Sequence, residues 1–109
     1  MEDLDSIEAQ LATLIETANI VPKPARSVTP IYLFATAGMR LLPSSDQDRV
    51  LSVAAAALSR SPFLFSPNYI AVITGMTEAL YGWVAANFLE EKLGAPPEET
   101  SGTVEMGGA

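Results

Sequence analysis

The 109-residue sequence predicts an α/β fold in which helices pack on a mostly parallel sheet. Two short, continuously apolar runs, at residues 31–35 and 69–73, are each typical of a strand buried on both faces of a parallel sheet. Amphipathic helical patterns lie before, between and after these runs, and this alternation favours parallel strands joined by right-handed crossovers. Hydrophobic residues make up 49% of the chain, well above the composition of a disordered polypeptide.

The first expected element is a helix over residues 5–20. Asp5 followed by Glu8 fits a capping box, which places negative charge at the favourable end of the helix dipole. Pro22 and Pro24 are expected to end the helix. Its apolar residues share one helical face: Ile7, Leu11, Leu14, Ile15 and Ala18.

The first strand, over residues 31–35, is followed by Gly38 and then by a second helix over residues 46–59. Ser44 or Ser45 is expected to cap this helix. Its apolar residues again fall on one face: Val50, Val53, Ala54, Ala57 and Leu58.

The second strand, over residues 69–73, ends before Gly75 and leads into a third helix. This helix is expected to start at Thr77 or Glu78, to end near residue 93 and to be closed by Gly94. Its expected buried stripe consists of Leu80, Trp83, Val84 and Phe88.

A polar, proline-rich linker at residues 95–101 precedes a short expected strand at residues 103–106. Gly107 and Gly108 then begin a turn, one residue before the sequence ends. A strand that runs into such a turn normally leads to another element, and three helices leave one sheet face thinly covered. We therefore expect the sequence to be part of a larger fold.

Composition excludes several classes of function. Thirteen acidic residues against six basic ones give a net charge of −7, which argues against a nucleic-acid-binding surface. With no cysteine and no histidine, the chain offers no disulfide framework, zinc ribbon, thiol nucleophile or Ser-His triad. No stretch approaches the roughly 18 apolar residues of a membrane span, and the acidic start lacks the basic region of a signal peptide.

Each expected strand ends at a turn of small residues, at 35–38, 74–78 and 105–108. In open parallel sheets, ligands bind beyond the carboxyl ends of the strands. Glycines let a backbone approach a ligand closely, and successive N–H groups form nests that bind anions. The three turns together predict a phosphate site, although glycine is also common in ordinary tight turns.

Three blocks resemble signature segments of the apyrases, the ecto-nucleoside triphosphate diphosphohydrolase family. Residues 35–42, Ala-Thr-Ala-Gly-Met-Arg-Leu-Leu, resemble the second segment. Residues 73–89, which include Tyr-Gly-Trp, resemble the third, and residues 102–109 resemble the start of the fourth. The order and spacing of the blocks also fit, and the resemblance covers nearly the whole chain.

The resemblance implies a partial actin-like (ribonuclease-H-like) ATPase fold of two lobes, with the nucleotide in the cleft between them. Residues 1–94 would form the latter part of the first lobe, and residues 95–101 the linker at the lobe junction. Residues 102–109 would supply the first strand and phosphate loop of the second lobe. The first signature segment would precede Met1, and the rest of the fourth would follow Ala109.

The resemblance also implies hydrolysis of the terminal phosphate of nucleoside tri- and diphosphates without a covalent intermediate. In the family, calcium or magnesium (Ca2+ or Mg2+) bridges the phosphates, and a glutamate of the third segment activates the attacking water. Glu78 matches that glutamate. Phosphoryl transfer needs mainly positioning and charge stabilisation, and a carboxylate beside the water supplies a base. A position at a helix start would favour the charged carboxylate.

Other positions match residues of the family that bind metal or phosphate. Glu105 matches an acidic residue that holds the metal through water, and the alternative is a solvated strand residue. Gly107, Gly108 and Ala109 match a loop that cradles phosphate. Thr36 matches a residue near the metal and its waters and is expected to bind phosphate, although threonine also commonly closes a buried strand.

Four further residues within the blocks have interpretations of their own. Arg40 is expected to form a salt bridge or to bind carbonyl oxygens, with phosphate binding as the alternative. Tyr81 and Trp83 are expected to pack in the core. Thr77 stands where many relatives have an acidic residue, and it could cap the third helix.

Two other interpretations of the sequence remain open. An exopolyphosphatase-like phosphohydrolase also uses a glutamate on a strand-to-helix turn and a glycine-rich loop. A non-catalytic fragment could instead oligomerise through an unpaired strand edge. Because parts of the apyrase site are expected outside this sequence, we expect the chain alone to be inactive. Apyrases usually work in the secretory pathway, bound to membranes, or outside the cell.

Overall fold

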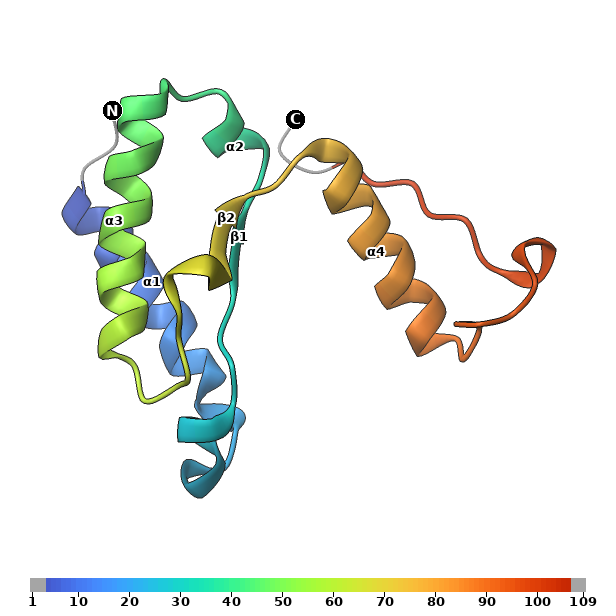
Figure 1. Cartoon of the computed structure of the whole chain (residues 1–109), viewed down its shortest axis with the longest axis horizontal. Coiled ribbons are helices and arrows are strands. Elements are labelled where there is room, and N and C mark those ends of the chain that lie inside the picture. Colours follow the sequence, from blue (N-terminus) through green and yellow to red (C-terminus); the bar gives the residue numbers. More distant parts are fainter. Residues whose placement is uncertain (1–3, 107–109) are drawn as a thin grey trace.

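The computed structural model describes residues 4–106 (Figure 1). In chain order, its helices and strands are α1 (Leu4–Thr17), β1 (Leu33–Ala35), α2 (Ala37–Arg40), α3 (Ser44–Arg60), β2 (Ile70–Val72) and α4 (Gly75–Leu89). Short 3₁₀ helices lie at Ala18–Ile20, Lys23–Val28, Pro67–Tyr69 and Pro97–Glu99. Figure 1 shows α1 and α3 next to the sheet, while α4 and the C-terminal segment lie on the other side.

The two strands are parallel, which confirms the α/β class. Leu33 lies opposite Ile70, and Ala35 lies opposite Val72. An isolated bridge continues the pairing toward the N-terminal ends, where the Leu64 N–H donates to the Thr29 carbonyl at 3.0 Å. Each strand has three residues rather than the expected five, partly because a 3₁₀ helix at Pro67–Tyr69 takes up the start of the second run.

The core lies between α1, α3 and the loop that follows α3. Its buried apolar side chains are Leu11, Ala54, Ala57, Leu58 and Phe63. Ala54 and Leu58 are only 2% exposed, because the small alanines of α3 let α1 approach closely. The apolar faces expected for the first two helices are therefore the faces that pack, except at Leu14, which is 64% exposed.

Helix α3 begins one residue earlier than a serine cap would require. Pro43 occupies the N-cap position with extended backbone, and no side chain caps the helix. The Pro43 carbonyl accepts from the N–H groups of Asp46 and Gln47, both at 3.0 Å. The expected capping by Ser44 or Ser45 is wrong, because proline ends the preceding loop and Ser44 is already helical.

The sheet is not buried on both faces as expected. Along β1 and the residues before it, Tyr32 is 53% exposed and Phe34 is 45% exposed, while their neighbour Leu33 is more covered. Aromatic contacts run across this face: the Tyr32 ring stacks on Tyr69 at 4.4 Å, and the Phe34 ring lies 5.6 Å from that of Tyr81 in α4. The structure therefore has one sheet face toward α1 and α3, without fully buried strand residues, and one partly open aromatic face.

Helix α4 differs from the expected third helix at both ends and along its face. It begins at Gly75, because the Thr74 hydroxyl caps it by accepting from the Thr77 N–H at 3.1 Å. Thr77 is therefore not the cap. The helix ends at Leu89, where Glu91 turns into the left-handed region with φ of 59°. Gly94, with φ of 83°, lies in the following turn and does not close the helix.

The expected buried stripe of α4 is largely exposed. Leu80 is 54% exposed and Phe88 is 67% exposed, whereas Trp83 is partly covered. The fully buried residue of this helix is Asn87. The periodic pattern marked the helix but not the buried face, because α4 packs mainly against the segment that follows it and not against the α1–α3 body.

Residues 103–106 form no strand in the structure, so the expectation of a short strand there is wrong. A strand needs a neighbour to pair its backbone groups, and no strand within residues 4–106 pairs with this segment. Val104 and Met106 are 98% and 86% exposed. In Figure 1 the segment returns along α4 toward the N-terminal end of that helix.

Candidate functional site

The candidate site lies at the carboxyl ends of the two parallel strands. Thr36 follows β1 directly and precedes α2, while Ile73 and Thr74 separate β2 from α4. Figure 1 shows α2 and the start of α4 at the same end of the sheet. This is the edge at which open parallel sheets bind their ligands.

Arg40, the last residue of α2, joins the two strand-to-helix turns. Its Nη1 donates to the Ile73 carbonyl at 2.7 Å, and its Nη2 lies 3.1 Å from Oε2 of Glu78. The side chains of Arg40 and Glu78 are 31% and 20% exposed, so the ion pair is only partly solvated. The expectation that Arg40 forms a salt bridge or binds a carbonyl is confirmed, since it does both.

Glu78 lies in the first turn of α4, where its N–H donates to the Thr74 carbonyl at 2.9 Å. The positive end of the helix dipole favours a carboxylate at this position. The ion pair with Arg40 directs the carboxylate toward the turn that follows β1. Glu78 and the α2 turn are thus brought together from sequence positions 38 residues apart.

Thr36 begins the same turn and is partly buried. Its carbonyl accepts from the N–H groups of Met39 and Arg40 at 3.0 and 3.2 Å. Its hydroxyl makes no capping hydrogen bond with α2. Thr36 therefore shares the sheet edge with Glu78, while Arg40 makes the direct contact to that carboxylate.

A shallow hollow of about 290 Å³ adjoins this contact. It is lined by Arg40, Gln47, Val72, Ile73 and Thr74. The Gln47 side chain donates to the Leu42 carbonyl at 3.0 Å, which fixes it against the loop before α3. The hollow opens at the carboxyl end of β2, next to the Arg40 side chain that binds Glu78.

The other expected site residues are not gathered at this edge by any contact among the described residues. Glu105 is exposed, and Gly107, Gly108 and Ala109 lie outside the described residues. Within residues 4–106, no group of three or more acidic side chains could hold a metal ion as a cage. Over the same residues, no helix is long and apolar enough to cross a membrane.

A second cluster, which the sequence did not predict, joins α4 to the segment after it. Asn87 Nδ2 donates to the carbonyls of Trp83 and Ser101, at 2.9 and 3.0 Å, and Asn87 Oδ1 accepts from the Ser101 N–H at 2.9 Å. Lys92 Nζ lies 3.0 Å from the Ser101 hydroxyl and 2.9 Å from the Glu90 carboxylate. We call Asn87, Glu90, Lys92 and Ser101 the Asn87 cluster.

The Asn87 cluster also changes the acidity of Glu90. A hydrogen bond from Ser101 and then the nearby Lys92 ammonium hold the pKa of Glu90 below its ordinary value. The sequence signal for this cluster is slight: a single amide, Asn87, set between Ala86 and Phe88 in a largely apolar helix.

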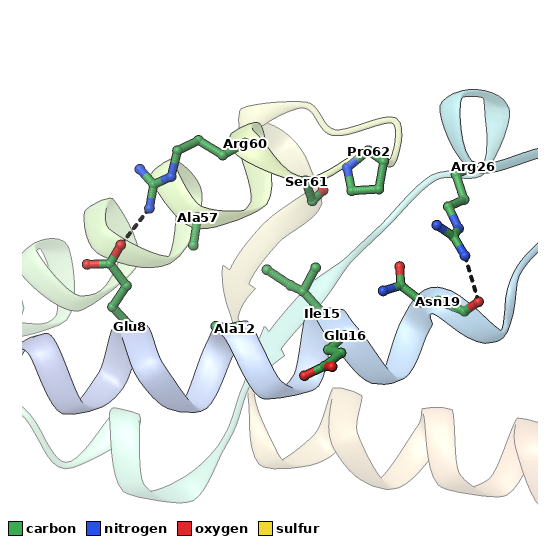
Figure 2. Close-up of a pocket in the computed structure, with 10 residues that line it drawn as sticks. All are labelled: Glu8, Ala12, Ile15, Glu16, Asn19, Arg26, Ala57, Arg60, Ser61 and Pro62. Atoms are coloured by element: carbon green, nitrogen blue, oxygen red, sulfur yellow. Dashed lines mark hydrogen bonds and ion pairs between the residues drawn. The ribbon is translucent and has the colours of Figure 1, made fainter. Parts of the chain in front are cut away.

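A larger groove lies elsewhere, between α1 and the end of α3 (Figure 2). It has a volume of about 440 Å³ and is lined by charged groups of both signs. Arg60 pairs with Glu8 at 2.6 Å, and Arg26 donates to the carbonyls of Asn19 and Val21, both at 2.9 Å. The first contact ties α1 to α3, and the others tie the 3₁₀ helix at Lys23–Val28 to the segment that follows α1. We therefore interpret the groove as a gap between packed elements.

Comparison with known proteins gives a consistent result. The chain matches the GDA1/CD39 (nucleoside phosphatase) family over residues 1–109. It is 44% identical over 109 residues to the Arabidopsis thaliana protein named Probable apyrase 6, covering 99% of this chain and 20% of that protein. It is 40% identical over 95 residues to the Golgi apyrase of Schizosaccharomyces pombe, covering 84% of this chain and 17% of that protein.

A bovine relative extends the comparison to animals. The Bos taurus protein named Ectonucleoside triphosphate diphosphohydrolase 5 is 36% identical over 97 residues, covering 88% of this chain and 22% of that protein. The chain thus spans about a fifth of the length of the curated relatives that it matches. The apyrase resemblance of the three sequence blocks is confirmed.

Proposed function

Because the chain belongs to the GDA1/CD39 (nucleoside phosphatase) family, we propose that it supplies the water-activating edge of a nucleoside tri- and diphosphate phosphohydrolase. The observation that carries this proposal is the position of Glu78. Its carboxylate lies at the carboxyl edge of the sheet, at the start of α4, and Arg40 holds it against the turn that follows β1.

In the proposed reaction, Glu78 is the general base. A water bound beside its carboxylate attacks the terminal phosphorus of the nucleotide, and the water proton passes to Glu78. A new bond forms between the water oxygen and phosphorus, while the bond to the leaving phosphate oxygen breaks. The products are inorganic phosphate and a nucleotide that is one phosphate shorter, with no covalent intermediate.

Backbone groups would position the phosphates. We assign this task to Thr36, at the turn after β1, and to Gly107, Gly108 and Ala109. Successive N–H groups at glycine-containing turns bind anions without adding counter-charge, and glycine lets the phosphate approach closely. The positive end of the α4 dipole, which lies at the same edge, would add a favourable field for the phosphates.

A divalent cation, Ca2+ or Mg2+, is proposed as the cofactor, with Glu105 holding it through water. Glu105 is a single, exposed carboxylate, and residues 4–106 contain no cage of three acidic groups. Such a donor fits an outer-sphere contact, because Mg2+ keeps several of its waters and takes one or two carboxylates. When bound, the cation neutralises phosphate charge.

The same family membership supports two further proposals, one on the position of this chain in the whole fold and one on cellular location. Residues 1–94 would belong to the first lobe of an actin-like (ribonuclease-H-like) fold, residues 95–101 to the lobe junction and residues 102–109 to the second lobe. The enzyme would act in the secretory pathway, at membranes or outside the cell, which is consistent with the names of the yeast Golgi apyrase and the bovine ectonucleoside relative.

The experiment is a chimera in which this sequence replaces the matching region of the Arabidopsis relative named Probable apyrase 6. We expect it to release phosphate from ATP and ADP with calcium or magnesium. Glu78→Gln should lower kcat at least about 100-fold, since it removes the general base. The 109-residue chain alone should release no phosphate above its own Glu78→Gln variant.

The matched control is Glu16→Gln, which removes an exposed carboxylate of α1. It should leave kcat unchanged. A folded chimera that hydrolyses ATP equally well with and without the Glu78 carboxylate would refute the assignment. Preference for long-chain polyphosphate over ATP would instead identify the exopolyphosphatase-like alternative.

A further inference from the structure

Asn87 is the most completely buried polar side chain among the described residues, with no exposed surface. Its side chain makes three hydrogen bonds of ordinary length, between 2.9 and 3.0 Å. One goes to the Trp83 carbonyl within α4, which fixes the amide's orientation on its own helix. The other two go to the backbone of Ser101, 14 residues later.

The two bonds to Ser101 define both the position and the direction of the chain there. Asn87 Nδ2 reaches the Ser101 carbonyl, and Asn87 Oδ1 accepts from the Ser101 N–H. The amide thus pairs with both backbone groups of one residue, as a neighbouring strand would. The Ser101 hydroxyl, held between Lys92 and Glu90, adds a third attachment on the same residue.

The spacing of residues on each side of this attachment is well matched. Along α4, Glu78 precedes Asn87 by nine residues, which corresponds to an axial rise of about 13.5 Å. In the returning segment, Glu105 follows Ser101 by four residues, which span at most about 13–14 Å when extended. Figure 1 shows this segment running back toward the N-terminal end of α4.

We propose that Asn87 is a positioning residue that sets the register of residues 102–106 along α4, so that Glu105 lies level with Glu78. Nine residues turn an α-helix by about 900°, so Asn87 and Glu78 lie on opposite faces of α4. The two carboxylates with proposed roles in hydrolysis would then flank the N-terminal end of the helix from its two sides. The functional meaning of this register rests on the proposed function, which gives Glu78 and Glu105 their roles. The register itself is a separate property that can be measured without activity.

The first experiment measures the register in the 109-residue chain. The chain has no cysteine, so Glu105→Cys gives a single site for a nitroxide label. We expect the label to broaden the Glu78 amide signal in NMR spectra, and Asn87→Ala to abolish this broadening while carbon shifts of α4 stay helical. Mixing labelled, unenriched chain with enriched, unlabelled chain identifies any broadening that arises between molecules.

Two variants complete this experiment. Asn87→Asp keeps the acceptor for the Ser101 N–H but removes the donors, so it should retain part of the broadening. Asn19→Ala, at an exposed asparagine after α1, should retain all of it. Unchanged broadening at Glu78 in Asn87→Ala, or none in the labelled parent chain, would overturn the register while leaving the proposed function of Glu78 intact.

The second experiment asks whether Asn87 acts through Glu105. In the chimera described above, Asn87→Ala and Glu105→Ala should each lower kcat. The double variant should be no slower than Glu105→Ala alone, because residues that act through one another are not additive. Multiplicative losses would show that Asn87 is merely structural, and this outcome does not depend on whether Glu78 is the base.

Discussion

Arg40 shows how much one side chain can organise at the sheet edge. Its guanidinium binds a carbonyl that follows β2 and a carboxylate that begins α4, while its own backbone belongs to the turn after β1. Arginine suits this task because its planar fork presents several donors in fixed directions. The sequence predicted the type of contact, but only the fold identified both partners.

We expect Arg40→Ala to lower the free energy of unfolding by about 1–3 kcal/mol, since it removes a charged hydrogen bond to Ile73 and a partly exposed ion pair. Arg40→Lys should be intermediate, because an ammonium cannot reproduce the fork. Urea unfolding measures both. Arg60→Ala is the matched control: its pair with Glu8 is 62% and 51% exposed and should cost less than about 1 kcal/mol. Equal losses would contradict this ranking.

The acidity of Glu90 gives a prediction with a definite sign. Its pKa is lowered in the folded chain, first by the Ser101 hydrogen bond and then by Lys92. A lowered pKa means that the charged carboxylate is stabilised above the ordinary glutamate pKa, and that this contribution is lost as pH falls through the folded value. Ser101→Ala and Lys92→Met should each raise the Glu90 pKa, as measured by NMR titration, because each removes a hydrogen bond to the charged carboxylate. An unchanged Glu90 pKa in either variant would contradict the assigned causes.

At the scale of elements, helical periodicity correctly predicted the packed faces of α1 and α3, apart from Leu14, which is exposed. It failed for α4, where Leu80 and Phe88 are exposed and Asn87 is buried. Periodicity reports that a helix has an apolar face, but what covers that face is decided by the rest of the chain. The positions of two of the expected strands were also predictable, while the start of the second was set by the 3₁₀ helix at Pro67–Tyr69.

Part of the candidate site was predictable from the sequence, and part was not. The sequence blocks indicated Glu78 and the turn at Thr36, because short motifs carry their residues at fixed spacing. They could not indicate the cluster around Asn87, whose partners are 14 residues apart and depend on the path of a loop. Loop paths depend on local turns such as the left-handed Glu91, which no hydrophobic pattern encodes.

The start of α4 depends on the Thr74 cap. Thr74→Ala should destabilise the first turn of the helix by about 0.5–2 kcal/mol, because the Thr77 N–H loses its acceptor. Amide hydrogen exchange at residues 77–80 measures this loss. Thr77→Val is the matched control: it removes a hydroxyl from the same turn but keeps the N–H that Thr74 accepts. Greater loss of protection in the control would show that the cap is assigned to the wrong threonine.

As a whole, the molecule is more open than a compact domain of its length. Its radius of gyration is 16.2 Å, whereas a compact chain of this length has about 13 Å. Many large apolar side chains are exposed on α4 and the segment after it, including Met76, Phe88, Leu89, Val104 and Met106. Apolar surface of this kind favours association with other surfaces.

We therefore expect the 109-residue chain to self-associate, with a sedimentation coefficient that rises with concentration. Phe88→Ser combined with Leu89→Ser should reduce this rise without lowering stability by more than about 0.5 kcal/mol per site, since both side chains are largely exposed. Leu14→Ser, at an exposed position on α1, serves as a control on another part of the surface. A single monomeric species over the whole concentration range would contradict this expectation.

The short sequence distance within the Asn87 cluster has a consequence for the order of folding. Asn87 and Ser101 are 14 residues apart, whereas Glu8 and Arg60, which join the first and third helices, are 52 apart. Closing the shorter loop costs less chain entropy, by about 1.2 kcal/mol on a logarithmic length dependence. The fourth helix and the segment through Ser101 thus form a local unit. This unit can fold before the first and third helices pack together.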